Sequence, residues 1–157
     1  MSLIANIAAF QRKLADLPLA KYDAGDIVLT AGSITGRLLI LKAGAVVVMK
    51  EGVEIAEIST HGAVFGEFSV LLDRPHTADV VAVKASQFYV ANAATPFMQD
   101  PVVLLYVAAV LAGRLDRANK AVVHLKGQIE DREPFFVIGQ TVETIERALG
   151  VGGASRH

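Results

Sequence analysis

The hydrophobic pattern divides the chain into three parts. Near the N-terminus, apolar residues recur at helical spacing behind Ser2, which predicts a short amphipathic helix over residues 3–15. From residue 20 to about residue 94 the pattern changes to short runs of Val, Ile and Leu separated by glycines. From Asp100 the spacing is helical again, with Asp100 suited to the N-cap and Pro101 to the first helical position.

The middle part predicts a mainly β structure. Gly44 and the pair Glu51-Gly52 separate neighbouring apolar runs and are turn signals. Short strands at this spacing favour a compact antiparallel barrel or roll over a parallel sheet. The predicted strands span residues 26–30, 37–42, 45–50, 53–58, 78–84 and 87–91.

The predicted long helix carries an apolar stripe with the 4-3-4-3 spacing of a heptad repeat. Beyond Gly113 charged residues surround this stripe, and a narrow stripe on a charged helix usually faces another helix. We therefore expect a homodimer through the long helix, while packing of the stripe on its own domain is the alternative. The stripe consists of Leu104, Ala108, Leu111, Leu115, Ala118, Val122, Leu125 and Ile129.

The end of the long helix sets the expected domain boundary. Pro134 cannot continue a helix, so we predict one domain over residues 1–132, which includes the long helix at about 100–132. A short tail with a small helix is expected at residues 133–157. A tail of this length cannot hold a helix-turn-helix with a supporting helix, so we predict no DNA-binding domain.

Composition narrows the function classes. The chain has 157 residues, of which 53% are hydrophobic, and this composition is typical of a globular protein. The formal net charge of -1 gives no basis for nucleic acid binding through bulk electrostatics, and the absence of cysteine excludes disulfides. The start lacks the features of a signal peptide, and the longest apolar run, 102–112, is shorter than the ~18 residues of a membrane span. We expect a cytoplasmic protein.

The side chains that could support catalysis do not form a catalytic pattern. Ser69 lacks the context of a nucleophile elbow, and Glu67 and Asp73 are not spaced as an acid–base pair. We therefore predict no enzyme activity, no metal and no cofactor. The histidines are scattered rather than grouped at metal-ligand spacing: His61, His76, His124 and His157.

Residues 65–80, FGEFSVLLDRPHTADV, carry the most specific chemistry. A glycine-containing loop leads into a short helix at 68–72, and the backbone N–H groups of such a loop attract anions. Glu67 could accept hydrogen bonds from sugar hydroxyls, and Thr77 follows the rigid Pro75 and supplies a hydroxyl donor. The segment therefore suits a phosphate joined to a ribose.

This segment resembles the phosphate-binding cassette of the cyclic nucleotide-binding domain family, which includes catabolite activator protein and the protein kinase A regulatory subunits. We call residues 65–80 the cassette. The resemblance extends over residues 3–132. The residues that carry it are Phe65-Gly66-Glu67, Leu71-Leu72 and Pro75-His76-Thr77-Ala78-Asp79-Val80, with Gly25-Asp26-Ile27-Val28, Gly32, the run 39–48 and Asp100-Pro101 outside the cassette.

The resemblance implies an eight-stranded antiparallel β-roll of the jelly-roll type with flanking helices. It also implies a non-catalytic regulatory sensor whose ligand is a cyclic nucleotide, cAMP or cGMP. Glu67 would accept from the ribose 2′-hydroxyl, and the base would lie toward the long helix, where Arg117, Asn119 or Val122 could reach it. The expected ligand-binding residues are Phe65, Gly66, Glu67, Phe68, His76, Thr77, Ala78, Arg117 and Asn119.

His76 departs from the family, which places an arginine at this position. Arginine makes paired, charged hydrogen bonds to phosphate, whereas neutral histidine donates one. The difference is about 1–2 kcal/mol, or roughly ten- to thirtyfold in affinity. Three interpretations are open: a weak or atypical cyclic nucleotide site, a site for another anion, or a degenerate fold that acts as a protein-interaction and dimerisation module without nucleotide. We predict the first.

Overall fold

The computed structural model describes the backbone of residues 4–130 and the side chains of residues 8–129. The chain divides into two compact units, residues 1–107 and 108–157. The predicted tail at 133–157 and its small helix lie outside the described residues.

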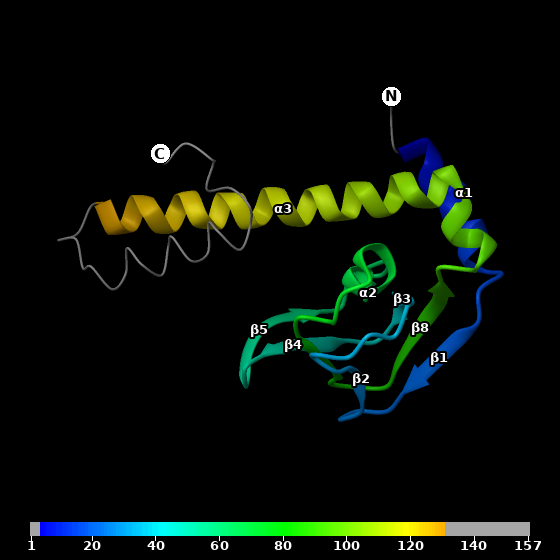
Figure 1. Ribbon diagram of the computed structural model, residues 1–157, viewed down its shortest axis with the longest axis horizontal. Helices are drawn as coiled ribbons and strands as arrows, with labels where there is room; N and C mark the ends of the chain where they lie inside the picture. The colour runs from blue at the N-terminus through cyan, green and yellow to red at the C-terminus, as the bar shows by residue number, and fades with distance from the viewer. Residues whose placement is uncertain (1–3, 131–157) are drawn as a thin grey trace. The chain divides into compact units, whose positions relative to one another are not determined.

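The described residues of the first unit form eight strands, three short helical elements and the start of a long helix (Figure 1). In chain order the elements are α1 (Ile4–Leu14), β1 (Leu19–Tyr22), β2 (Ile27–Leu29), β3 (Arg37–Ala43), β4 (Val46–Lys50), β5 (Val53–Ile58), β6 (Val64–Phe65), α2 (Glu67–Leu72), β7 (Asp79–Ala82), β8 (Ser86–Asn92), the 3₁₀ helix η1 (Pro96–Gln99) and α3 (Pro101–Glu130).

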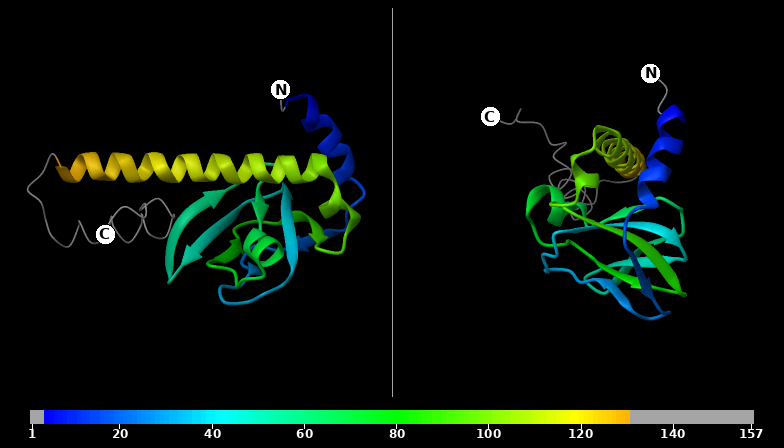
Figure 2. Two further views of the ribbon diagram at one scale, coloured as in Figure 1. Left: turned by 45° about the horizontal axis from the view of Figure 1, so that its top comes forward. Right: turned by 90° about the vertical axis from the view of Figure 1, so that its right-hand side faces the viewer.

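The strands form two four-stranded antiparallel sheets, in the orders β1-β8-β3-β6 and β2-β7-β4-β5. The two sheets form two layers, as the right-hand view of Figure 2 shows. Every second residue of a strand points inward, so the apolar positions of both sheets meet in one core. The predicted fold class, an antiparallel β-roll with flanking helices, is confirmed. The core consists of Val28, Leu29, Leu39, Leu41, Val46, Phe65, Val80, Ala82 and Phe88.

The sequence pattern located most of the strands. The strand predicted at 53–58 has those bounds in the structure, and the helix predicted at 3–15 is α1. The pattern missed β1 and β6. Strand β1 alternates between exposed and half-buried positions, and β6 has only two residues, so neither presents an apolar run.

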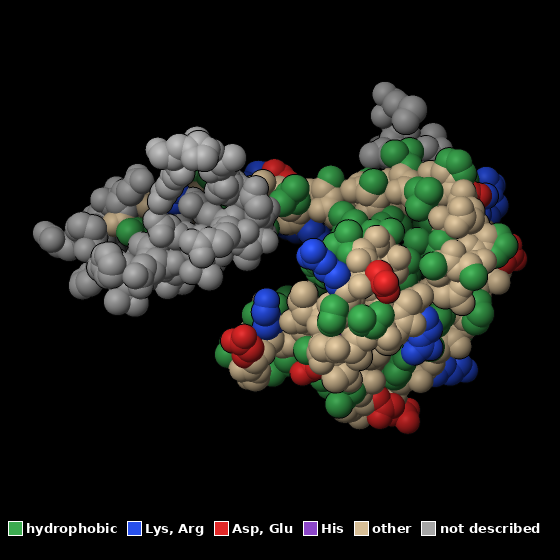
Figure 3. All heavy atoms as spheres, viewed as in Figure 1, with side chains coloured by type: hydrophobic (Ala, Val, Ile, Leu, Met, Phe, Trp, Pro, Cys, Tyr) green, Lys and Arg blue, Asp and Glu red, His purple; other side chains and the backbone are tan. Residues whose placement is uncertain are grey.

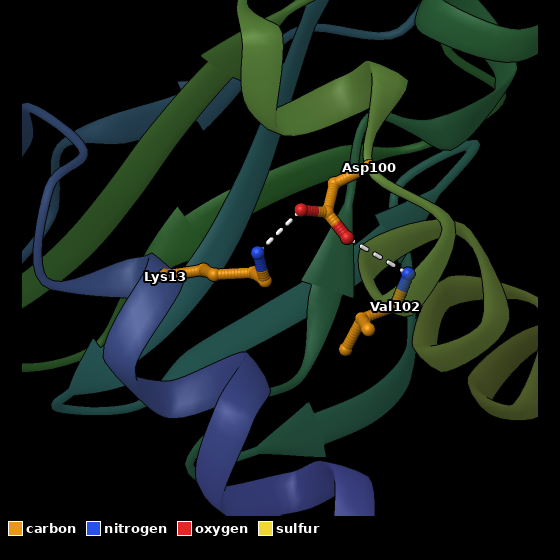
Figure 4. Close-up of polar contacts among 3 residues, drawn as sticks. All are labelled: Lys13, Asp100 and Val102. Atoms are coloured by element: carbon orange, nitrogen blue, oxygen red, sulfur yellow. Dashed lines mark hydrogen bonds and ion pairs between the residues drawn. The ribbon is translucent and has the colours of Figure 1, made fainter.

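Asp100 connects the start of α3 to α1 (Figure 4). Its Oδ1 accepts from the backbone N–H of Val102 at 2.8 Å, as expected of an N-cap residue. Its Oδ2 pairs with the ammonium of Lys13 in α1. The hydrogen bond from Lys13, followed by that from Val102, lowers the pKa of Asp100.

An aromatic cluster covers the same end of the roll. Phe10 of α1 stacks on Tyr106 of α3, with ring centroids 3.7 Å apart, and lies 5.9 Å from Phe97 of η1. The Tyr106 hydroxyl donates to the carbonyl of Gly62 at 2.9 Å. Gly62 has a φ of +89°, and a Cβ there would collide with that hydroxyl. The first turns of α3 are therefore bonded to the loop that precedes β6.

In the second unit, α3 continues without a break to Glu130. The stripe has mixed exposure: Leu115 is 47% exposed, whereas Val122 is 7% exposed. The homodimer therefore stays a prediction. No helix among the described residues combines the length and apolar character that crossing a membrane requires.

We predict that the two interactions of Asp100 can be separated by mutation. Asp100→Asn keeps an oxygen for Val102 but loses the charge that pairs with Lys13, whereas Asp100→Ala loses both. The melting temperature near neutral pH, followed by circular dichroism, should decrease in the order wild type, Asn variant, Ala variant. The pKa of Asp100 is lowered in the folded state. The contribution of its charge to the stability of the fold should therefore be complete above pH 3.8, the ordinary pKa, and should be lost as the pH falls through the lowered pKa of the folded state. Equal melting temperatures for wild type and Asp100→Ala would contradict this assignment.

Candidate functional site

The cassette begins with a glycine that no other residue could replace without strain. Gly66 is buried and has a φ of +83°, and a Cβ there would collide with the carbonyl oxygen of Arg37. Helix α2 starts at Glu67 and ends at Leu72, and its C-cap residue Asp73 has a positive φ of 52° and donates its N–H to the carbonyl of Phe68. The short helix predicted at 68–72 is thereby confirmed.

Ser69 joins α2 to the loop between β2 and β3. We call residues 30–36 the β2–β3 loop. Ser69 is buried, and its Oγ accepts from the backbone N–H groups of Thr35 at 3.0 Å and Gly36 at 2.6 Å. Two loop amides therefore find their acceptor on a buried cassette side chain, whose polar atom requires partners.

His76 makes a second connection to this loop and is buried, with 5% of its surface exposed. Its N–H donates to the carbonyl of Ser33 at 2.9 Å, and its own carbonyl accepts from Gly32 at 2.8 Å. The ring Nε2 lies 3.0 Å from Thr35 Oγ1. A Cβ on Gly66 would lie 3.6 Å from the ring Cε1, so the imidazole sits against the cassette glycine. His76 is therefore a fixed interior residue and not a surface turn residue.

The environment of His76 keeps its imidazole neutral at neutral pH. Burial lowers its pKa below the ordinary value of 6.5, and the negative charge of Glu67 opposes this shift only in part. The family's arginine would carry a permanent charge at this point. In the free protein the position provides a neutral hydrogen-bonding ring.

The structure brings three of the expected ligand-binding residues together. Gly66 lies beside the His76 ring, and the Glu67 carboxylate is near enough to act on its pKa. The other expected cassette residues differ in exposure: Phe65 is buried, Ala78 is half-buried, and Phe68 and Thr77 are exposed.

The remaining two expected residues, Arg117 and Asn119, lie on α3 in the second unit, and their contact with a base stays a prediction. Arg117 is exposed, and Asn119 carries a buried Oδ1 that has no hydrogen-bond partner among the described residues. Within the described part of the chain, no three His, Asp or Glu side chains gather in a geometry that could hold a metal ion.

Sequence reasoning missed Thr35 and Ser69 as parts of the site. Ser69 was considered only as a nucleophile, although a serine on a short helix among apolar residues is itself a sign of a buried hydrogen bond. Thr35 gives no local signal because its partners are 34 and 41 residues away in the chain.

Hydrophobic side chains are visible at the surface around α2 in Figure 3. The helix itself exposes Phe68, Leu71 and Leu72, which are 37%, 44% and 55% exposed. The polar side of α2 is therefore its inner side, where Ser69 lies, and its apolar side faces out.

The comparisons with known proteins agree with this fold. Residues 19–95 match the family model described as cyclic nucleotide-binding domain. A comparison with curated protein sequences gave no match. The catabolite activator protein of Thermus thermophilus is 21% identical with a TM-score of 0.61, and the match covers 98% of this chain and 86% of that protein.

Two further solved structures share the fold. A cyclic nucleotide-binding domain from Methylobacillus flagellatus is 24% identical with a TM-score of 0.64, over 73% of this chain and 71% of that one. The regulatory domain of Toxoplasma gondii PKA, solved with cAMP, is 18% identical with a TM-score of 0.55, over 70% and 45% of the two chains. Residues 19–95 therefore match the cyclic nucleotide-binding domain family, and the eight strands of the β-roll and the cassette lie within this match.

Proposed function

We propose that this domain is a non-catalytic regulatory sensor that binds a cyclic nucleotide, cAMP or cGMP, at the cassette. The observation that carries the proposal is the meeting of Gly66, Glu67 and His76 at one turn of a family domain. The cAMP in the Toxoplasma relative, which shares the fold, supports this ligand class. The nucleotide acts as a regulatory ligand and is not a cofactor.

Each group of the ligand has an expected partner. Glu67 accepts from the ribose 2′-hydroxyl, while the backbone of Gly66 and Glu67 and the hydroxyl of Thr77 face the cyclic phosphate. Thr35 occupies Nε2 of His76, which leaves Nδ1 for a phosphate oxygen. The base lies toward α3, with Arg117, Asn119 or Val122 as its contacts.

Binding at the cassette would shift the equilibrium between two arrangements of α3 and the roll, because a ligand favours the state that it contacts better. The output would pass through a homodimer at the stripe, or through a protein partner, in the cytoplasm. The alternative is an interaction module that binds no nucleotide. The burial of His76 and the hydrogen bond between its ring and Thr35 favour this alternative.

The first prediction from this proposal concerns the contact between Glu67 and the ribose. Glu67→Ala should reduce the affinity for cAMP or cGMP by about ten- to hundredfold in a calorimetric titration, because a charged hydrogen bond is lost. A 2′-deoxy cyclic nucleotide should bind the unmodified protein with a similar loss. Glu57→Ala, on the exposed strand β5, is the matched control and should bind normally. Equal affinity for the ribose and deoxyribose ligands would show that Glu67 serves only to stabilise α2.

The second prediction concerns pH. A bound phosphate favours the imidazolium, so binding should raise the pKa of His76 and take up protons. Affinity should therefore increase as pH falls from about 8, and the increase should continue below pH 6.5 because burial lowers the pKa in the free protein. The measurement is calorimetry at several pH values in buffers of different ionisation enthalpy.

His76→Arg is the matched variant for this test. It should bind about ten- to thirtyfold more tightly at neutral pH, and its affinity should change little with pH because arginine stays charged. Without ligand the variant should melt at a lower temperature, since it buries an unpaired charge. If it still ignores both cyclic nucleotides at millimolar concentration, the domain is an interaction module and the sensor proposal fails.

The third prediction concerns the homodimer. Leu115→Glu places a charge at an exposed position of the stripe and should convert the dimer to a monomer without unfolding it. Val123→Glu, at a position outside the stripe that is 70% exposed, should leave the dimer intact. Light scattering at tens of micromolar protein reads the mass directly. A monomeric wild-type protein under these conditions would mean that the stripe packs within its own chain.

A further inference from the structure

Thr35 takes part in three hydrogen bonds, two of which involve its hydroxyl. Its backbone N–H donates to Ser69 Oγ, which holds the residue in place. Its Oγ1 accepts from the N–H of Arg37 at 3.3 Å and lies 3.0 Å from His76 Nε2. With the Arg37 amide directed at the oxygen, the single hydroxyl proton can point to Nε2.

This direction determines the tautomer of His76. A neutral imidazole has one N–H and one bare nitrogen, and the hydrogen bond at one nitrogen decides which is which. If Nε2 accepts the Thr35 proton, the ring proton is on Nδ1. Because burial keeps this ring neutral near pH 7, the choice of tautomer decides what the ring can offer a ligand.

The tautomer matters because the oxygens of a cyclic phosphate only accept hydrogen bonds. An Nδ1–H can donate to such an oxygen, whereas a bare Nδ1 would direct its lone pair at a negative charge. We propose that Thr35, which lies outside the cassette, is a positioning residue that holds His76 of the free protein in the Nδ1–H form, so that the ring already presents an N–H donor to the ligand phosphate. The ligand part rests on the proposed function, while the tautomer is a property of the protein alone.

The backbone around the pair is organised to hold both partners. His76 is bonded through its N–H and its carbonyl to Ser33 and Gly32, which precede Thr35 in the same loop. Ser69 binds the amides of Thr35 and Gly36. Since neither residue can move without breaking backbone hydrogen bonds, the Thr35–His76 geometry is set before any ligand binds.

The test reads the tautomer by NMR. A long-range ¹H–¹⁵N correlation spectrum of the ligand-free, ¹⁵N-labelled protein near pH 7 distinguishes a protonated ring nitrogen from a bare one. We expect His76 to show a protonated Nδ1. Thr35→Val keeps the shape of the side chain and removes the hydroxyl, so protonated Nε2 should appear. Thr35→Ser keeps the hydroxyl and should retain the wild-type form.

Affinity for cAMP gives the second measurement on the same variants. Thr35→Val should lose about three- to tenfold, the effect of one neutral hydrogen bond, and Thr35→Ser should stay within about twofold of wild type. Thr60→Val, at an exposed threonine in the loop before β6, is the matched control and should change neither measurement. Circular dichroism verifies that each variant is folded.

The outcomes separate this proposal from the proposed function. A protonated Nε2 in the wild-type protein, or a tautomer that Thr35→Val leaves unchanged, overturns the role of Thr35. A tautomer that changes without any change in affinity overturns the donor role of His76. A tautomer that changes as expected while no variant, wild type included, binds a cyclic nucleotide supports the role of Thr35 and overturns the proposed function.

Discussion

The hydrogen bonds between the cassette and the β2–β3 loop are the constraint on which the site depends. Ser69 and His76 lie seven residues apart at the two ends of this contact, and both are buried. A buried polar side chain without partners would cost about 1–3 kcal/mol, so each must be satisfied by the loop. The backbone amides of Thr35 and Gly36 in turn donate their hydrogen bonds to Ser69 Oγ and not to a neighbouring strand. Each segment therefore requires the other.

This mutual dependence explains how a histidine can stand where the family has an arginine. An arginine reaches toward a ligand and stays charged, and its partner is the phosphate. The shorter histidine here has a protein partner, Thr35, and is neutral because it is buried. The free protein therefore carries no unpaired charge in this position. With histidine at this position, the cassette is a satisfied part of the fold.

The fold and the site differ in how far the sequence could predict them. Strand β5 and helix α1 were found because apolar residues repeat at the period of their structure. Gly66 and Glu67 could be proposed as site residues because the cassette is a local motif. Thr35 could not be found in this way, since periodicity reports which face of an element is buried and says nothing about polar pairs between distant loops. Strand β6 was missed for a related reason: its two residues are a strand only because β3 lies beside them.

The hydrogen bond from Tyr106 to Gly62 has a mechanical consequence. Gly62 is four residues before Gly66, and the short strand β6 lies between them. Tyr106 is therefore bonded to the chain close to the start of the cassette. Gly62 is also bonded to β3, because its N–H donates to the carbonyl of Leu41. The beginning of α3 is therefore a fixed end. Lifting the first turns of α3 away from the loop that precedes β6 would therefore break the hydrogen bond from Tyr106.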